Sequence, residues 1–164
     1  MCLRVFVAAA APLPARPKPP AGIRPTFWVE PLADGDLRQV RAALDQPHVV
    51  EVGAHTGCAC GFASAELAFD AGVATRAALA ALEPALADDA RAELARADAS
   101  RAALRDLVEQ GLGAGPVRIY GVWWGDEASL PVAHRAIALD QLVDQLEPIP
   151  EKTVLSVIAP AARP

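Results

Sequence analysis

One long amphipathic helical pattern, over residues 86–110, stands among short apolar runs that are typical of β-strands. Leu104 and Leu107 mark its buried stripe, and charged side chains such as Glu93 and Arg101 fall mostly outside that stripe. The strand and helix patterns do not alternate strictly. We therefore expect a single α/β domain, with α+β as the alternative, in which helices pack on a mixed β-sheet as a sandwich.

Shorter elements are expected on both sides of this helix. Runs rich in β-branched and aromatic residues predict strands, and apolar residues at helical spacing predict short helices. The predicted strands are 3–8, 26–29, 48–53, 117–124, 133–137 and 153–158, and short helices are expected around 34–44, 79–82 and 139–146.

The length of 164 residues fits one domain, residues 1–164, with a core large enough to need no disulfide framework. Six prolines lie between Pro12 and Pro25. Because proline fixes φ and lacks an N–H, residues 9–25 are expected to form an extended connection. Residues 159–164 are expected to be a flexible tail.

Charge and hydropathy argue against several classes of partner. The formal net charge is −5, and Lys and Arg are scattered singly, so we expect no nucleic-acid binding. No run approaches the roughly 18 large apolar residues of a membrane span. The apolar start lacks a basic region and runs into prolines, which argues against an export signal. We therefore expect a cytoplasmic protein, a setting in which thiols stay reduced.

The chemistry is concentrated in one loop after the predicted strand 48–53, with the sequence His-Thr-Gly-Cys-Ala-Cys-Gly. Thiolates and imidazoles are ligands for zinc, copper or an iron–sulfur cluster. With one further cysteine near the N-terminus, the set is the Cys₃His of a closed tetrahedral zinc site. Zinc is the first expectation, and copper and iron–sulfur stay open. The predicted ligands are Cys2, His55, Cys58 and Cys60.

This four-ligand site carries a geometric condition. Cys2 opens the first predicted strand, and Cys58 follows the strand 48–53. The two strands must therefore be antiparallel neighbours, or one must cross at the end of the sheet. If Cys2 lies too far away, His134 is the fallback ligand.

Three other functions stay open. A thiol enzyme, redox or acyl-transfer, would use Cys58 or Cys60 as the nucleophile, with His55 lowering its pKa. Met1-Cys2 and the strand after it resemble the start of N-terminal-nucleophile amidotransferases and related hydrolases, which implies Cys2 as the nucleophile after removal of Met1. In an interaction module without catalysis, the cysteines would only pack. No specific partner is predicted.

Several segments together resemble an uncharacterised bacterial family of small proteins. They are Met1–Ala9 with the following Leu13-Pro14, the loop region Gly53–Phe62, and the later strand with its turn, Tyr120–Glu127. The resemblance implies that Cys2 and the loop belong to one pattern. It implies no activity.

Overall fold

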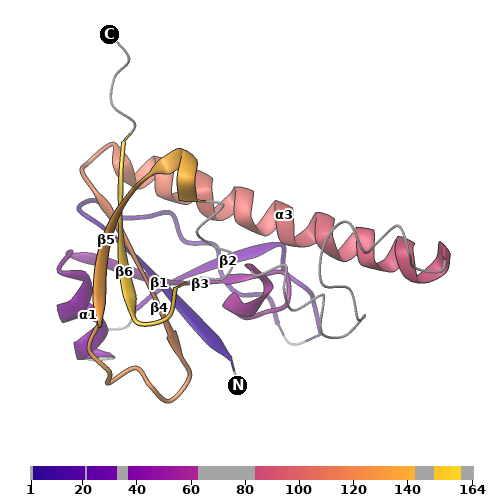
Figure 1. Ribbon diagram of the computed structural model, residues 1–164, viewed down its shortest axis with the longest axis horizontal. Helices are drawn as coiled ribbons and strands as arrows, with labels where there is room; N and C mark the ends of the chain where they lie inside the picture. Colours follow the sequence, from indigo (N-terminus) through magenta and orange to yellow (C-terminus); the bar gives the residue numbers. More distant parts are fainter. Residues whose placement is uncertain (1, 21, 33–36, 63–83, 143–149, 160–164) are drawn as a thin grey trace, which may run out of the picture.

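The computed structural model describes residues 2–20, 22–32, 37–62, 84–142 and 150–159. Its strands are β1 (Leu3–Ala9), β2 (Phe27–Pro31), β3 (His48–Ala54), β4 (Val117–Trp123), β5 (Ala133–Ala138) and β6 (Thr153–Ile158). They form one six-stranded sheet in the order β2-β3-β1-β4-β6-β5 (Figure 1). β5 and β6 are parallel and every other neighbouring pair is antiparallel. The predicted mixed sheet in a single α/β or α+β domain is confirmed.

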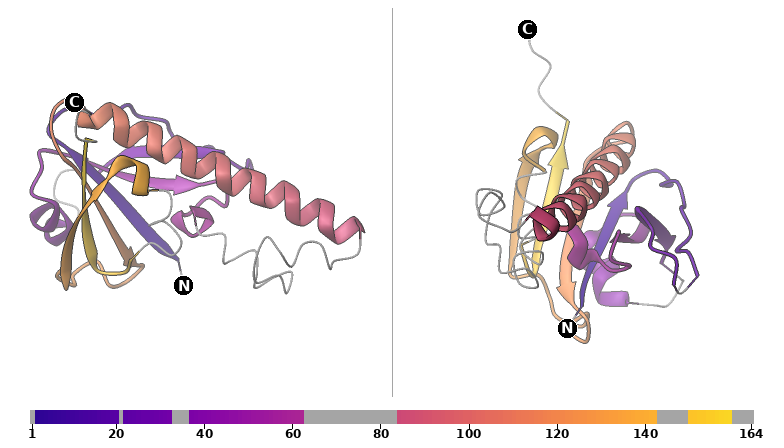
Figure 2. Two further views of the ribbon diagram at one scale, coloured as in Figure 1. Left: turned by 45° about the horizontal axis from the view of Figure 1, so that its top comes forward. Right: turned by 90° about the vertical axis from the view of Figure 1, so that its right-hand side faces the viewer.

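Helices cover both faces of this sheet. The long helix α3 (Pro84–Leu112) lies along one face, and its N-terminal part extends beyond the strands (Figures 1 and 2). There Leu104 and Leu107 pack in one core cluster with alternate residues of β1 such as Val5. The short helix α1 (Arg38–Leu44) belongs to a second cluster on the opposite face, with Phe6 and Tyr120.

The sequence of α3 explains its form. Ala, Leu, Arg and Glu are strong helix formers, and buried positions recur at helical spacing through Ala97, Leu104 and Val108. Arg101, expected outside the stripe, is buried instead. Charged residues are frequent along the helix. Within the described residues, no helix combines the length and the apolar character that crossing a membrane requires.

Most element boundaries differ little from the predicted ones. α1 begins at Arg38, and Leu37 at its N-cap position adopts a left-handed conformation without a side-chain cap. Residues 34–36 of the helix expected at 34–44 lie outside the described residues, as does the helix expected at 79–82. In the segment predicted as a helix at 139–146, the described part begins with a 3₁₀ turn, η3 (Leu139–Gln141), and residues from 143 onward are not described.

Part of the Pro-rich connection pairs with the edge strand β2. The N–H of Arg16 donates to the carbonyl of Val29 (2.9 Å), and the N–H of Val29 donates back to Arg16 (2.7 Å). These two hydrogen bonds form an isolated β-bridge rather than a strand. The bridge fixes one end of this segment, and residues 18–20 and 22–25 then line a cavity together with the loop that follows β3.

Gly53 is a position at which we expect a large stability effect. It pairs directly with Trp28 on β2, and a Cβ at this position would overlap the buried indole ring. Because overpacking forces the ring or the strands apart, Gly53→Ala should lower the free energy of unfolding by about 3 kcal/mol. Urea denaturation measures this loss. Gly113→Ala is the matched control, since the nearest atom to its added Cβ is 3.6 Å away, and it should change stability by less than about 0.5 kcal/mol.

Candidate functional site

The chain turns tightly directly after β3, and this turn carries the predicted loop. The N–H of Gly57 donates to the carbonyl of Ala54 (2.9 Å), and the N–H of Ala54 donates to the carbonyl of Cys58 (2.9 Å). Gly57 has a φ of 84°, a left-handed conformation that glycine adopts without steric cost. A short 3₁₀ turn, η1 (Ala59–Phe62), follows, so Cys58 directly precedes it and Cys60 is its second residue.

Three cysteine side chains meet at this turn. β1 and β3 are antiparallel neighbours, as the four-ligand prediction requires, and Val5 pairs with Val52. Continuing this register places Cys2 at the level of the loop. The side chains of Cys60 and Cys2 lie close enough to Cys58 to lower the pKa of its thiol. The structure therefore brings together the three predicted cysteines from two distant parts of the chain.

The three sulfurs differ in their access to solvent. Cys60 is buried, Cys58 is half-buried and Cys2 is exposed. The N–H of Leu3, the first residue of β1, donates to Cys60 Sγ (3.1 Å), so β1 holds the buried sulfur in place. Cys58 thus combines partial exposure with two other thiols nearby.

The surroundings of Cys58 favour its thiolate. The side-chain hydrogen bond from Cys60 lowers the pKa of Cys58 most, and the Thr56 hydroxyl, the Cys60 backbone N–H and the Cys2 thiol lower it further. Burial opposes them, and together these effects bring the Cys58 pKa from 9.0 to about 5. The Thr56 Oγ1 lies 3.5 Å from Cys58 Sγ. At neutral pH this cysteine is therefore a thiolate, the form that attacks electrophiles and binds metals.

His55 does not join the sulfur cluster. Its imidazole is buried, with Nε2 2.9 Å from Glu93 Oε1 and Nδ1 3.2 Å from Ser100 Oγ. Because a carboxylate only accepts hydrogen bonds, Nε2 donates to Glu93. Both ring nitrogens are thereby engaged with residues of α3, and neither is directed at Cys58. The structure therefore separates His55 from the other three predicted ligands.

Ser100 is the residue that anchors the start of the loop to α3. Its fully buried Oγ accepts the backbone N–H of His55 (3.2 Å) and lies 2.7 Å from the carbonyl of Thr26. Sequence reasoning missed Ser100 and its neighbour Glu93. The available signal was a serine at a stripe position of an alanine-rich helix, where a hydroxyl needs a buried partner.

Arg101 anchors the other end of the loop. Its buried guanidinium donates to the carbonyl of Phe62 (2.9 Å), the last residue of η1, and pairs with Asp98 on the same helix. Together, Ser100 and Arg101 attach the loop to α3 before and after the cysteines. The helix that dominates the sequence pattern is therefore also the support of the site.

Other residues considered from the sequence lie outside the cluster. Exposed His134 is on β5, which β4 and β6 separate from β1. Trp124 is 66% exposed and contacts the guanidinium of Arg4 through its ring. Glu127 also pairs with Arg4 (2.9 Å). Trp124 and Glu127 therefore both contact Arg4 near the start of β1.

Across the ranges described, no group of three or more His, Cys, Asp or Glu residues is arranged so that it could hold a metal ion. The zinc site of four ligands stays a prediction, and His55 is directed away from it.

Family models, curated proteins and solved structures were each compared with this chain, and none of the three comparisons finds a match. The resemblance to an uncharacterised bacterial family therefore stays a prediction as well.

Proposed function

We propose that this protein carries out thiol–disulfide exchange, with Cys58 as the attacking thiolate and Cys60 as the resolving thiol. The observation that carries the proposal is the half-buried Cys58 thiol, which lies 3.5 Å from Thr56 Oγ1 and whose pKa the nearby Cys60 side chain lowers most. A low-pKa, partly accessible cysteine beside a second thiol is the arrangement that exchange requires. We place this activity in the cytoplasm, where other thiols restore the reduced form.

The proposed reaction has two displacements. The Cys58 thiolate attacks one sulfur of a substrate disulfide, forms a mixed disulfide and releases the other half as a thiolate. Cys60 then loses its proton to solvent and attacks Cys58 Sγ, which releases the second half. The substrate gains two electrons, and the cysteine pair loses two as its disulfide forms.

Acyl transfer is less well supported than exchange. It needs a general base beside the nucleophile. His55, which the sequence suggested as the group that lowers the pKa of the nucleophile, is held by Glu93 and Ser100. Exchange needs no such base, because the thiolate is already formed at neutral pH.

The test uses the reduced full-length chain and 2-hydroxyethyl disulfide, an uncharged probe, with products identified by mass spectrometry. The wild-type protein should end with a Cys58–Cys60 disulfide. Cys60→Ser should stop at the mixed disulfide on Cys58, and Cys58→Ser should lose the fast attack on the probe. Cys2→Ser is the matched control and should still complete the sequence. Equal rates for wild type and Cys58→Ser would contradict the proposal.

Binding of a thiophilic ion, zinc first, is a second candidate. The observation that favours it is the third sulfur, since exchange uses two thiols and the side chain of Cys2 also contacts Cys58. In the described residues the three sulfurs are not arranged as a metal site, so zinc would have to draw them together. Three thiolates would then leave one zinc position for an outside ligand. Competition with a chromogenic chelator distinguishes the candidates. Stoichiometric zinc binding that is lost in Cys2→Ser supports the ion, whereas exchange should go to completion in Cys2→Ser, because Cys2 is neither the attacking nor the resolving thiol.

A further inference from the structure

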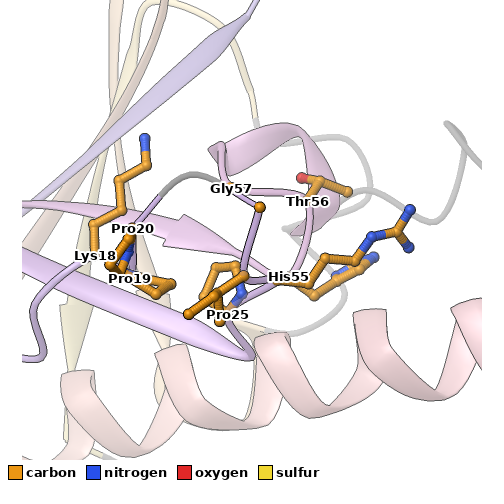
Figure 3. A pocket seen from close by; sticks show the side chains of 10 residues that line it. Lys18, Pro19, Pro20, Pro25, His55, Thr56 and Gly57 are labelled. Carbon is orange, nitrogen blue, oxygen red and sulfur yellow. The ribbon is translucent and has the colours of Figure 1, made fainter.

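A cavity of about 420 Å³ lies beside the turn that carries the cysteines. Its walls come from the Pro-rich segment before β2 and from the loop after β3. Figure 3 shows Lys18, Pro19 and Pro20 on one side of this cavity and His55 and Thr56 on the other. Pockets for small molecules span about 300–1,000 Å³, so the cavity has the size to take one.

The cavity adjoins the attacking sulfur. Thr56 and Gly57 line it, and they directly precede Cys58 in the chain. The Thr56 hydroxyl also lies 3.5 Å from Cys58 Sγ. Cys58 itself does not line the cavity, so a ligand must extend past Thr56 and Gly57 to reach its sulfur.

Two cationic side chains line the cavity, Lys18 and Arg24. The Arg24 side chain is 75% exposed, and its closest ion-pair distance to Glu93 is 3.9 Å. Glu93 itself is engaged more closely by Arg96 and by His55. The described lining contains no acidic residue, so the cavity has a positively charged rim. The Lys18 ammonium lies over the Trp28 ring, 4.9 Å from its centroid, and would turn toward a bound anion.

The remaining walls are apolar and stiff. Pro19, Pro20 and Pro25 have fixed φ angles, so little chain entropy is lost when a ligand contacts them. Ile23, a lining residue that is 61% exposed, adds apolar surface. Such walls suit the methylene chain of a short organic molecule rather than a bare inorganic anion.

We propose that this cavity binds the carboxylate-bearing arm of a small disulfide substrate and holds its sulfur against Cys58. Lys18 and Arg24 attract the carboxylate, and the prolines contact the carbon chain between the carboxylate and the disulfide. The inference rests on the proposed exchange function and names its substrate class.

The test compares two symmetric disulfides of similar size, 3,3′-dithiodipropionate with two carboxylates and cystamine with two ammonium groups. Each rate with the reduced full chain is divided by the rate of the same disulfide with 2-mercaptoethanol, because the leaving thiols differ in pKa. The normalised rate should favour dithiodipropionate about tenfold at low salt, and the preference should shrink at high salt. Lys18→Gln and Arg24→Gln should each reduce the preference, and the double variant should bring it near unity.

Arg91→Gln is the control, because it removes one exposed positive charge from α3 outside the cavity lining. It should keep the preference. An equal or reversed preference in the wild type, or a preference that survives the double variant, overturns the inference while leaving exchange intact. If neither charged disulfide reacts, and 2-hydroxyethyl disulfide does not react either, the exchange function itself is wrong.

Discussion

Alkylation of Cys58 by iodoacetamide is expected to be almost as fast at pH 6 as at pH 8, with a half-maximal rate near the Cys58 pKa of about 5. The thiolate alone reacts, so the rate follows the deprotonated fraction and falls as pH drops through the pKa. An ordinary cysteine, with a pKa of about 8.5, would lose most of its rate over the same interval. Peptide mass spectrometry after timed quenching gives the rate at this residue.

As pH rises, the alkylation rate of folded Cys58 should change from faster to slower than that of an unfolded chain. At pH 6 the thiolate fraction of Cys58 exceeds that of an ordinary thiol by a factor of roughly 300. A low pKa also reduces intrinsic nucleophilicity, with a Brønsted slope of about 0.4–0.5, which removes roughly 30- to 60-fold. We therefore expect folded Cys58 to react about 5- to 10-fold faster than unfolded protein at pH 6, and more slowly above pH 9.

Two variants test the cause of the shift. Cys60→Ala removes the largest contribution to the low Cys58 pKa and should move the half-maximal pH upward further than Thr56→Val does. Both variants keep the Cys60 backbone N–H, so part of the shift should remain. If the alkylation rate of the wild type has its half-maximal pH near that of unfolded protein, the low Cys58 pKa is wrong, and the proposed function is contradicted with it.

The sheet could be predicted from the sequence because its strands are short, apolar and bounded by Pro and Gly. Residues 48–53 are an example, since β3 covers nearly the same range. Register and strand order depend on long-range pairing and could not be predicted. For Cys2 to reach the loop, β1 and β3 had to be antiparallel neighbours or one had to cross at the end of the sheet, and they are antiparallel neighbours.

The cysteines of the site could be located from their spacing, but the role of His55 could not. Proximity in sequence suggested that His55 shares the site with Cys58. The backbone turn at Gly57 separates them, and the imidazole finds its partners on α3 instead. Such partners lie 38 and 45 residues away in the chain, a separation at which local patterns carry no information.

Ser100→Ala is expected to produce the largest stability loss among the residues that support the loop. The buried Ser100 hydroxyl is the partner of the His55 backbone N–H and lies close to the carbonyl of Thr26. Removing the hydroxyl leaves buried polar groups without a hydrogen-bond partner, which costs about 1–3 kcal/mol for each group. The free energy of unfolding should therefore fall by about 2–4 kcal/mol. Urea denaturation measures this loss, and Ser156→Ala on β6, at a half-buried position, is the control.

The same variant tests whether α3 positions the sulfur cluster. Glu93→Gln keeps an acceptor for His55 Nε2 at a partly exposed position and should cost about 1 kcal/mol or less. If the anchor also sets the geometry at Cys58, Ser100→Ala should raise the half-maximal pH of alkylation, whereas Glu93→Gln should leave it close to wild type. An unchanged profile in Ser100→Ala, together with the stability loss, would mean that the Gly57 turn and the β1–β3 pairing hold the three sulfurs together without help from the helix.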